Sequence, residues 1–266
     1  MELTGEKKEK NQIFIQARTG STRLPDKVLL KIKDKTILEL IVERLSLVKD
    51  IDKIIIITTR KKRDDRIIKI AKKLGVNFFR GSENNVLDRF YQAKIKFQPD
   101  NIIRVTADCP LIDYNLINQG LKIFKKGDYD ILSLSNYGEE RTFPHGVDFD
   151  ILKSSALKIA WHYFFRKLNK DKEKFDKVFI NPIEYILKKK KFKKKILVNK
   201  KKLSYIRITL DYKEDFKLIK KIYENLYSKN KYFNLNEILK FLKNNSHLLN
   251  LNKKYVCLGK KLTIEK

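Results

Sequence analysis

Cysteine is scarce in this chain, which has only Cys109 and Cys257 among its 266 residues. The two lie far apart, and neither has partners at the spacing of a metal site. This usage excludes a disulfide-stapled scaffold, argues against a zinc site and suits a reducing compartment. We therefore expect a cytoplasmic protein.

Long apolar runs are also missing. No stretch approaches the ~18 apolar residues that a membrane-spanning helix needs. The first ten residues, MELTGEKKEK, are charged and contain no apolar core of the kind found in signal peptides. The sequence therefore predicts neither a membrane span nor a signal peptide.

Acidic residues are few, since 32 Asp and Glu stand against 61 Lys and Arg and leave a net charge of +29. Such an excess is typical either of binding to nucleic acid or an anionic membrane surface, or of a solvated, lysine-rich surface. The lysines are spread along the whole chain, and the recognisable modules of specific nucleic-acid readers are missing. We favour the solvated surface and expect no specific nucleic-acid partner. The charge would still attract small anionic ligands.

Two kinds of apolar segment alternate from residue 12 to residue 124. Short runs such as KIIIIT at 53–58 are apolar on both faces, like central parallel strands, and they alternate with segments of helical spacing. We expect strands at 12–17, 53–58, 76–79 and 102–106, and helices at 36–45, 64–74, 86–97 and 113–124. The alternation predicts an α/β fold, a Rossmann-like three-layer sandwich with a mostly parallel sheet and right-handed crossovers.

Beyond Gly127 the alternation is less regular. We expect strands at 129–135, 147–152, 196–198 and 205–209, the last two as candidates for antiparallel pairing, and helices at 154–168, 211–227 and 235–244. Residues 1–266 are interpreted as one domain. Within it, residues 137–205 are expected to form a smaller inserted lobe that covers the site or makes a dimer contact.

The loop after the first predicted strand concentrates residues that bind anions. It runs from Gln16 to Lys27 and carries one glycine, three hydroxyl side chains, two arginines and a lysine. Small and hydroxyl residues allow several backbone N–H groups to point at one anion, and Arg18, Arg23 and Lys27 would add full charges. Composition leaves two readings open, a triphosphate cradle or an ordinary loop with solvated bases. The spacing fits neither the Walker A loop nor GxGxxG.

Two further turns follow predicted strands, at Arg80-Gly81-Ser82 and at Asp108-Cys109-Pro110. Ligands of open parallel sheets bind beyond the carboxyl ends of the strands, so we expect both turns to gather beside the first loop. Asp108 could hold Mg²⁺ there or merely close a turn. Asp211 could likewise be a metal ligand or the N-cap of the helix that follows it.

The segment ARTGSTRLPDKVL, residues 17–29, resembles the N-terminal signature of the CTP-dependent sugar cytidylyltransferases. The similarity continues through FRGSENNVLDRF, RVTADCPLID, FPHGVDFDIL and RITLDYKEDF, so it covers most of the chain. These motifs are closest to the branch named after the spore coat polysaccharide biosynthesis protein F, within the CMP-3-deoxy-manno-octulosonate and CMP-acylneuraminate synthetase superfamily. The resemblance implies a homodimer that transfers CMP from CTP to a sugar acid or polyol phosphate for surface polysaccharide biosynthesis, with release of pyrophosphate.

The resemblance also implies roles for individual residues. The catalytic set would be Arg18, Lys27, Asp108 and Asp211, with Mg²⁺ held by Asp108 and Asp211. The nucleotide would be bound by Ala17, Arg18, Ser21, Arg23, Lys27, Arg80 and Ser82. The acceptor would be bound by His145 and Asp148, although a lone loop histidine is more often a solvated bystander.

The sequence departs from the family pattern in two places. Ala107 stands where the family usually carries glycine, and KVFINP at 177–182 replaces a segment that usually contains glutamate and histidine. The second departure concerns the acceptor side. Cys109 is interpreted as a small buried group rather than a nucleophile.

Two alternative functions remain at this stage. The spacing of Asp148 and Asp150 fits the Asp-x-Asp of a metal-dependent glycosyltransferase that uses a nucleotide sugar. The second alternative is a non-catalytic, basic nucleic-acid-binding protein.

Overall fold

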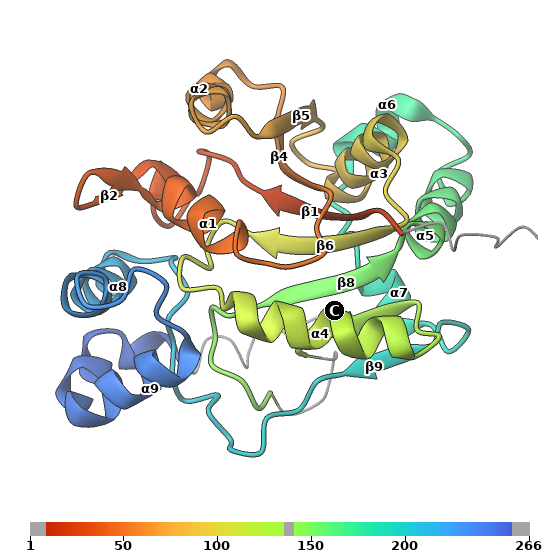
Figure 1. Cartoon of the computed structure of the whole chain (residues 1–266). Coiled ribbons are helices and arrows are strands. Elements are labelled where there is room, and N and C mark those ends of the chain that lie inside the picture. The colour runs from red at the N-terminus through yellow and green to blue at the C-terminus, as the bar shows by residue number, and fades with distance from the viewer. Residues whose placement is uncertain (1–8, 136–140, 257–266) are drawn as a thin grey trace, which may run out of the picture.

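The computed structural model describes residues 9–135 and 141–256 (Figure 1). Cys257 lies outside these ranges. The strands are β1 (Asn11–Gln16), β2 (Lys31–Ile32), β3 (Lys35–Thr36), β4 (Lys53–Thr59), β5 (Asn77–Gly81), β6 (Asn101–Thr106), β7 (Ile131–Ser133), β8 (Phe149–Lys153) and β9 (Lys194–Ile196).

Helices connect most of these strands. The α-helices are α1 (Ile37–Leu45), α2 (Asp65–Lys73), α3 (Val86–Phe97), α4 (Tyr114–Lys126), α5 (Ser154–Lys167), α6 (Lys172–Lys177), α7 (Glu184–Lys188), α8 (Lys213–Leu226) and α9 (Leu235–Asn244). The 3-10 helices are η1 (Lys27–Leu29), η2 (Lys62–Asp64), η3 (Ser246–Leu251) and η4 (Lys253–Tyr255). Among the described residues, no helix is long and apolar enough to cross a membrane.

The central sheet has the strand order β5-β4-β1-β6-β8-β7-β9, and β2 and β3 form a separate hairpin. Parallel pairs join β1 to β4 and β6, β4 to β5, and β7 to β9. Only β8 among the described strands of this sheet runs against its neighbours β6 and β7. The mostly parallel sheet predicted from the sequence is confirmed.

Apolar side chains form a separate core on each face of the sheet. One core joins it to α1, α2, α4, α8 and α9, and the other joins it to α3, α5, α6 and α7. Figure 1 shows α4 crossing the near side of the sheet and the blue helices α8 and α9 at one end of it. The arrangement is the predicted three-layer α/β sandwich.

Local sequence explains where several elements begin. Ile55, Ile56 and Ile57 of β4 are fully buried because helices cover both faces of the sheet. At the start of α1 the hydroxyl of Thr36 accepts a hydrogen bond from the Glu39 N–H, and the Glu39 carboxylate accepts one from the Thr36 N–H. This reciprocal pair of bonds is a capping box.

Two predicted strands of the second half need correction. Residues 205–209 form no strand; they make one isolated bridge, His145 to Arg207, because a single residue rather than a strand lies beside them. β9 lies at 194–196 and pairs parallel, not antiparallel, with β7 because the chain crosses back through α5–α7 before it enters the sheet. Both β8 and β9, which fall within 137–205, are strands of the central sheet.

Candidate active site

The loop after β1 is held by a buried carboxylate that the motifs did not single out. The N–H and hydroxyl of Thr19 donate to Oδ1 of Asp64 at 2.8 and 2.7 Å, and the hydroxyl of Thr59 donates to its Oδ2. Burial alone would raise the pKa of Asp64, but these hydrogen bonds lower it, so the group stays ionised. Asp64 thereby ties the loop to the end of β4.

Lys27, at the end of this loop, lies between the two carboxylates that were predicted to bind metal. Its Nζ is 2.9 Å from Oδ1 of Asp211 and 3.5 Å from Oδ2 of Asp108, and it donates to the Leu210 carbonyl at 2.8 Å. Burial alone would lower the pKa of Lys27, but the charges of Asp108 and Asp211 raise it above its usual value. Residues far apart in the chain therefore meet at one point.

The turn after β6 orients Asp108. The Thr106 hydroxyl donates to its Oδ1 at 2.6 Å, and the Cys109 Sγ lies 3.6 Å from the same oxygen. Burial alone would raise the pKa of Asp108, but the charge of Lys27 and the Thr106 hydrogen bond lower it. Burial and the Asp108 charge raise the pKa of the Cys109 thiol, which is the buried group that we expected.

Asp211 does not cap α8. The helix begins at Lys213, and Oδ2 of Asp215 accepts from the N–H groups of Asp211 and Tyr212 at 2.9 and 3.0 Å. The carboxylate that satisfies these N–H groups therefore comes from within the helix. The side chain of Asp211 is left to face the site.

The buried Arg207 holds the Asp211 carboxylate in place through its second oxygen, Oδ2. Arg207 donates to Oδ2 of Asp211 at 3.1 Å and makes two bonds of 2.9 Å to Asp215. Asn252 completes the network by donating to Asp215 at 2.8 Å and to the Arg207 carbonyl at 2.9 Å. Sequence reasoning missed this network, although Arg207 and Asp215 both lie in the motif RITLDYKEDF. On the open side, Arg23 lies 2.9 Å from Oδ1 of Asp211.

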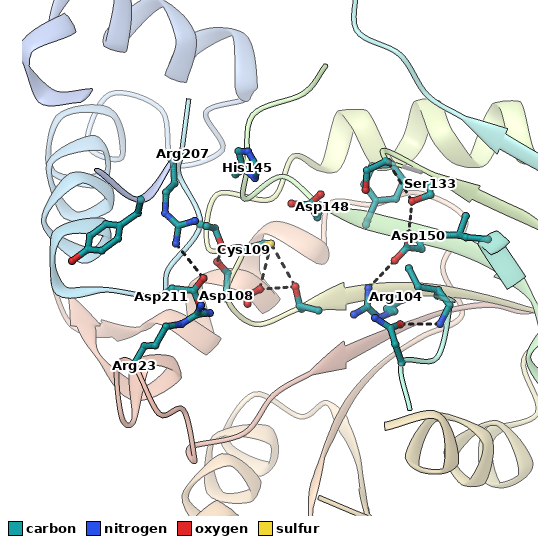
Figure 2. Close-up of a pocket in the computed structure, with 18 of the residues that line it drawn as sticks. Arg23, Arg104, Asp108, Cys109, Ser133, His145, Asp148, Asp150, Arg207 and Asp211 are labelled. Carbon is teal, nitrogen blue, oxygen red and sulfur yellow. Dashed lines mark hydrogen bonds and ion pairs between the residues drawn. The ribbon is translucent and has the colours of Figure 1, made fainter. Parts of the chain in front are cut away.

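Two cavities meet at Asp108 and Asp211. The smaller has a volume of about 300 Å³ and lies against the loop after β1, with Arg18, Ser21, Arg23 and Lys27 in its lining. The larger has a volume of about 400 Å³ and extends over the sheet toward α7; Figure 2 shows residues that line it. Arg23, Thr106, Asp108 and Asp211 line both.

Three residues predicted to bind the nucleotide lie outside both cavities. Arg80 donates to the carbonyls of Thr59 and Lys61 and pairs with Asp65 at 2.7 Å. The hydroxyl of Ser82 is bonded within the β5–α3 connection and to the Asp176 carbonyl, and Ala17 is buried. In this structure these side chains therefore shape the strand ends beside the site, and their contact with a nucleotide stays a prediction.

Both residues predicted to bind the acceptor, His145 and Asp148, line the larger cavity. His145 exchanges backbone hydrogen bonds with Ile206 and Ile208, which holds the chain before Asp211 across the end of β6. Burial and the nearby Arg141 lower the pKa of His145 to about 4, so its imidazole is neutral at pH 7. Asp148 pairs with Arg141 and accepts the Gly146 N–H at 3.1 Å.

A buried ion pair lies at the far end of the same cavity. Asp150 accepts from Arg104, its register partner on β6, at 2.8 Å and from the Ser133 hydroxyl at 2.6 Å. Asp148 pairs with Arg141, whereas Asp150 is bonded to Arg104 and Ser133, as Figure 2 shows for Asp150. This geometry gives no support to a glycosyltransferase Asp-x-Asp. In the sequence, Asp150 stands out only for its spacing from Asp148, and Arg104 does not stand out at all.

Comparison with known proteins agrees with this site. A family model described as cytidylyltransferase matches residues 12–243. An uncharacterized protein of Methanocaldococcus jannaschii is 36% identical over 242 residues, 90% of this chain and 93% of that protein. The Bacillus subtilis spore coat polysaccharide biosynthesis protein SpsF is 41% identical over 109 residues, 40% of this chain and 45% of its own length. A solved cytidylyltransferase from Leptospira borgpetersenii has a TM-score of 0.77 at 32% identity, covering 91% and 97% of the two chains.

These findings, together with the paired cavities, identify a nucleotidyltransferase. More narrowly, the chain belongs to the cytidylyltransferase family, and the resemblance seen in its motifs is confirmed.

Proposed function

We propose that this enzyme transfers CMP from CTP to a sugar acid or polyol phosphate and releases pyrophosphate. One observation carries the proposal, namely that two cavities of about 300 and 400 Å³ share Asp108 and Asp211 as a common wall. A transferase must hold donor and acceptor on either side of the reacting phosphorus. The family supports cytidine as the base of the donor.

The smaller cavity suits the triphosphate. Arg18, Arg23 and Lys27 would neutralise phosphate oxygens, and the Ser21 hydroxyl would donate to one of them. The acceptor oxygen attacks the α-phosphorus, the bond from that phosphorus to pyrophosphate breaks, and pyrophosphate leaves with the electron pair. A hydroxyl acceptor also loses its proton, whereas a phosphate acceptor does not need to. The protein contributes position and charge neutralisation.

Asp108 and Asp211 fit a magnesium ion. The Nζ of Lys27 lies within 3.5 Å of both carboxylates, so both reach one cation position. Mg²⁺ takes one or two carboxylates and completes its shell with phosphate oxygens and water. In residues 9–135 and 141–256, no group of three or more His, Cys, Asp or Glu could hold a metal unaided. A bound ion would neutralise the phosphates and hold the attacking and leaving oxygens in line.

The larger cavity would hold the acceptor. His145 and Asp148 line it together with the Arg104–Asp150 pair and the Ser133 hydroxyl. This mixture of donors and acceptors suits a polyhydroxylated, anionic molecule. The partial match to SpsF extends the proposal to surface polysaccharide biosynthesis.

We also propose that the enzyme is a homodimer that pairs through α5–α7, within the predicted inserted segment. Apolar residues are exposed here, with Phe179 71%, Ile159 44% and Tyr163 39% accessible. Tyr163 stacks on Tyr185 at 4.4 Å between ring centroids, which gives the face a rigid aromatic centre. Burying these side chains against a second copy would be favourable.

A pyrophosphate-release assay tests the proposed reaction. CTP, ATP, GTP and UTP are each supplied with Mg²⁺ and a panel of sugar acids and polyol phosphates, and release should require CTP and one acceptor class. Competition binding should rank CTP ahead of the other three, and equal affinity for all four would refute the choice of base. Consumption of a nucleotide sugar without pyrophosphate would instead indicate the glycosyltransferase.

A further inference from the structure

We propose that Lys27 occupies the metal position between Asp108 and Asp211 until a triphosphate draws its ammonium away, so that the metal binds with or after the nucleotide. The inference rests on the proposed function and adds an order of binding to it. It concerns a second role for Lys27, besides its contact with phosphate.

The Lys27 ammonium lies where a metal bound to both carboxylates would lie. The ammonium of Lys27 has three N–H donors and no acceptor, and it has three oxygen partners, in Asp108, Asp211 and the Leu210 carbonyl. Its side chain is only 12% exposed. An ion that binds both carboxylates must lie between them, where Nζ now lies. The ammonium and the ion therefore exclude each other.

The charged side chains around this position already balance one another. Three carboxylates of the site, Asp108, Asp211 and Asp215, stand among three cations, and the formal charges cancel. The cations are Arg23, Lys27 and Arg207. A divalent cation approaching this neutral group gains little attraction to offset the cost of losing water.

The three cations differ in whether they can move away from the carboxylates when a nucleotide binds. Arg207 cannot, because its side chain is 8% exposed and its guanidinium is bonded twice to the fully buried Asp215. Lys27 and Arg23 both line the smaller cavity, beside Arg18. A triphosphate there offers both side chains phosphate oxygens in exchange for carboxylates. When these two side chains move away, the carboxylates of Asp108 and Asp211 regain their net negative charge. The bound triphosphate then supplies oxygens that complete the coordination shell of the metal.

The consequence is a positive coupling between nucleotide and metal. Because coupling is reciprocal, the metal should raise nucleotide affinity by the same factor by which the nucleotide raises metal affinity. Without nucleotide, removal of the Lys27 charge should by itself open the metal position.

Manganese binding to the nucleotide-free, full-length protein tests this, with Mn²⁺ alone as the probe and the electron paramagnetic resonance signal of free Mn²⁺ as the readout. Lys27→Met, which keeps the length of the side chain, should bind Mn²⁺ roughly 10-fold more tightly than wild type or better, within the usual range of site coupling. Adding Asp108→Asn to Lys27→Met should abolish the gain. Lys153→Met is the matched control, since Lys153 pairs with the exposed Asp128 and should leave Mn²⁺ affinity at the wild-type value.

Equal Mn²⁺ affinity of wild type and Lys27→Met would overturn the inference. If Lys27→Met does not unfold cooperatively, Lys27→Gln replaces it with the same expectation. The two proposals fail separately. If Lys27→Met binds Mn²⁺ more tightly but the wild-type enzyme releases no CTP-dependent pyrophosphate, only the proposed reaction is refuted. If the enzyme turns over CTP but Lys27→Met shows no gain in Mn²⁺ affinity, only the role of Lys27 is refuted.

Discussion

Acid should destabilise this protein through His145, the histidine of the larger cavity. Burial, Arg141 and Arg207 disfavour its imidazolium, and Asp148 offsets them only in part, so its pKa falls from 6.5 to about 4. The unfolded chain therefore takes up the proton first as the pH drops. The stability that the neutral ring contributes is present above pH 6.5 and is lost progressively between 6.5 and about 4.

These pKa values set the magnitude. At pH 5 the unfolded histidine is mostly protonated and the folded one mostly neutral, which corresponds to about 2 kcal/mol of lost unfolding free energy relative to neutral pH. A loss of this size is a large part of the stability of an ordinary domain. It also means that at pH 7 His145 can serve an acceptor as a neutral hydrogen-bonding group and not as a cation.

Urea unfolding at pH 7 and pH 5, followed by circular dichroism, measures the effect. Between pH 7 and pH 5, wild type should lose about 2 kcal/mol more unfolding free energy than His145→Gln. The carboxylates titrate alike in both proteins, so their contribution cancels in this difference. His247→Gln, at an exposed histidine, should keep the wild-type loss. An equal loss in wild type and His145→Gln would refute the reasoning.

Three further predictions concern the site and the surface. Asp108→Asn and Asp211→Asn should each leave the fold intact and lower turnover by roughly 10²-fold, and the double variant should lose much less than the product of the two; near-normal turnover of either at low Mg²⁺ would remove that residue from the metal site. If the lysine excess is a solvated surface, binding to random duplex DNA should be weak and should collapse with salt, whereas tight, sequence-selective binding at ~0.15 M salt would contradict that interpretation. Phe179→Glu should convert dimer to monomer in analytical ultracentrifugation while Val198→Glu, equally exposed at 71%, should not; a dimer that survives the first change does not use this face.

The first half of the fold could be predicted because local and global signals agree there. The isoleucines of 53–58, the capping box of Thr36 and Glu39 and the strand-ending turns each specify one element, and short parallel connections leave few ways to arrange them. The convergence of Lys27 on Asp108 followed from the same argument. The loop that ends at Lys27 follows β1 and the turn that carries Asp108 follows β6, and these two strands are neighbours in the sheet.

Other parts of the site depend on contacts that spacing does not encode. Asp211 looked like a helix cap because an aspartate before a helix usually is one, yet Asp215 makes those bonds from within the helix. The outcome is decided by Arg207 and Asn252, which hold Asp215 from outside the helix. The position of the Arg80 side chain could not be predicted from spacing either. It donates to the carbonyls of Thr59 and Lys61, at and just beyond the end of β4, and therefore lies outside the cavities.

The two cavities of the site are therefore built in different ways. Most of the lining of the smaller cavity, the proposed nucleotide side, comes from the loop after β1, with Asp108 and Asp211 added from elsewhere, and the motif of that loop is typical of the family. The larger cavity, the proposed acceptor side, is assembled from several segments: β6, β7, β8, the segment before α7 and η4. They contribute Arg104, Ser133, Asp150, Asn181 and Tyr255 to its lining. Asn181 lies in the segment that departs from the family pattern. Because a cavity assembled this way can change its ligand without altering the loop, the identity of the acceptor should follow these five positions rather than the motif. Variants there should change which acceptor is used and leave CTP binding unaltered.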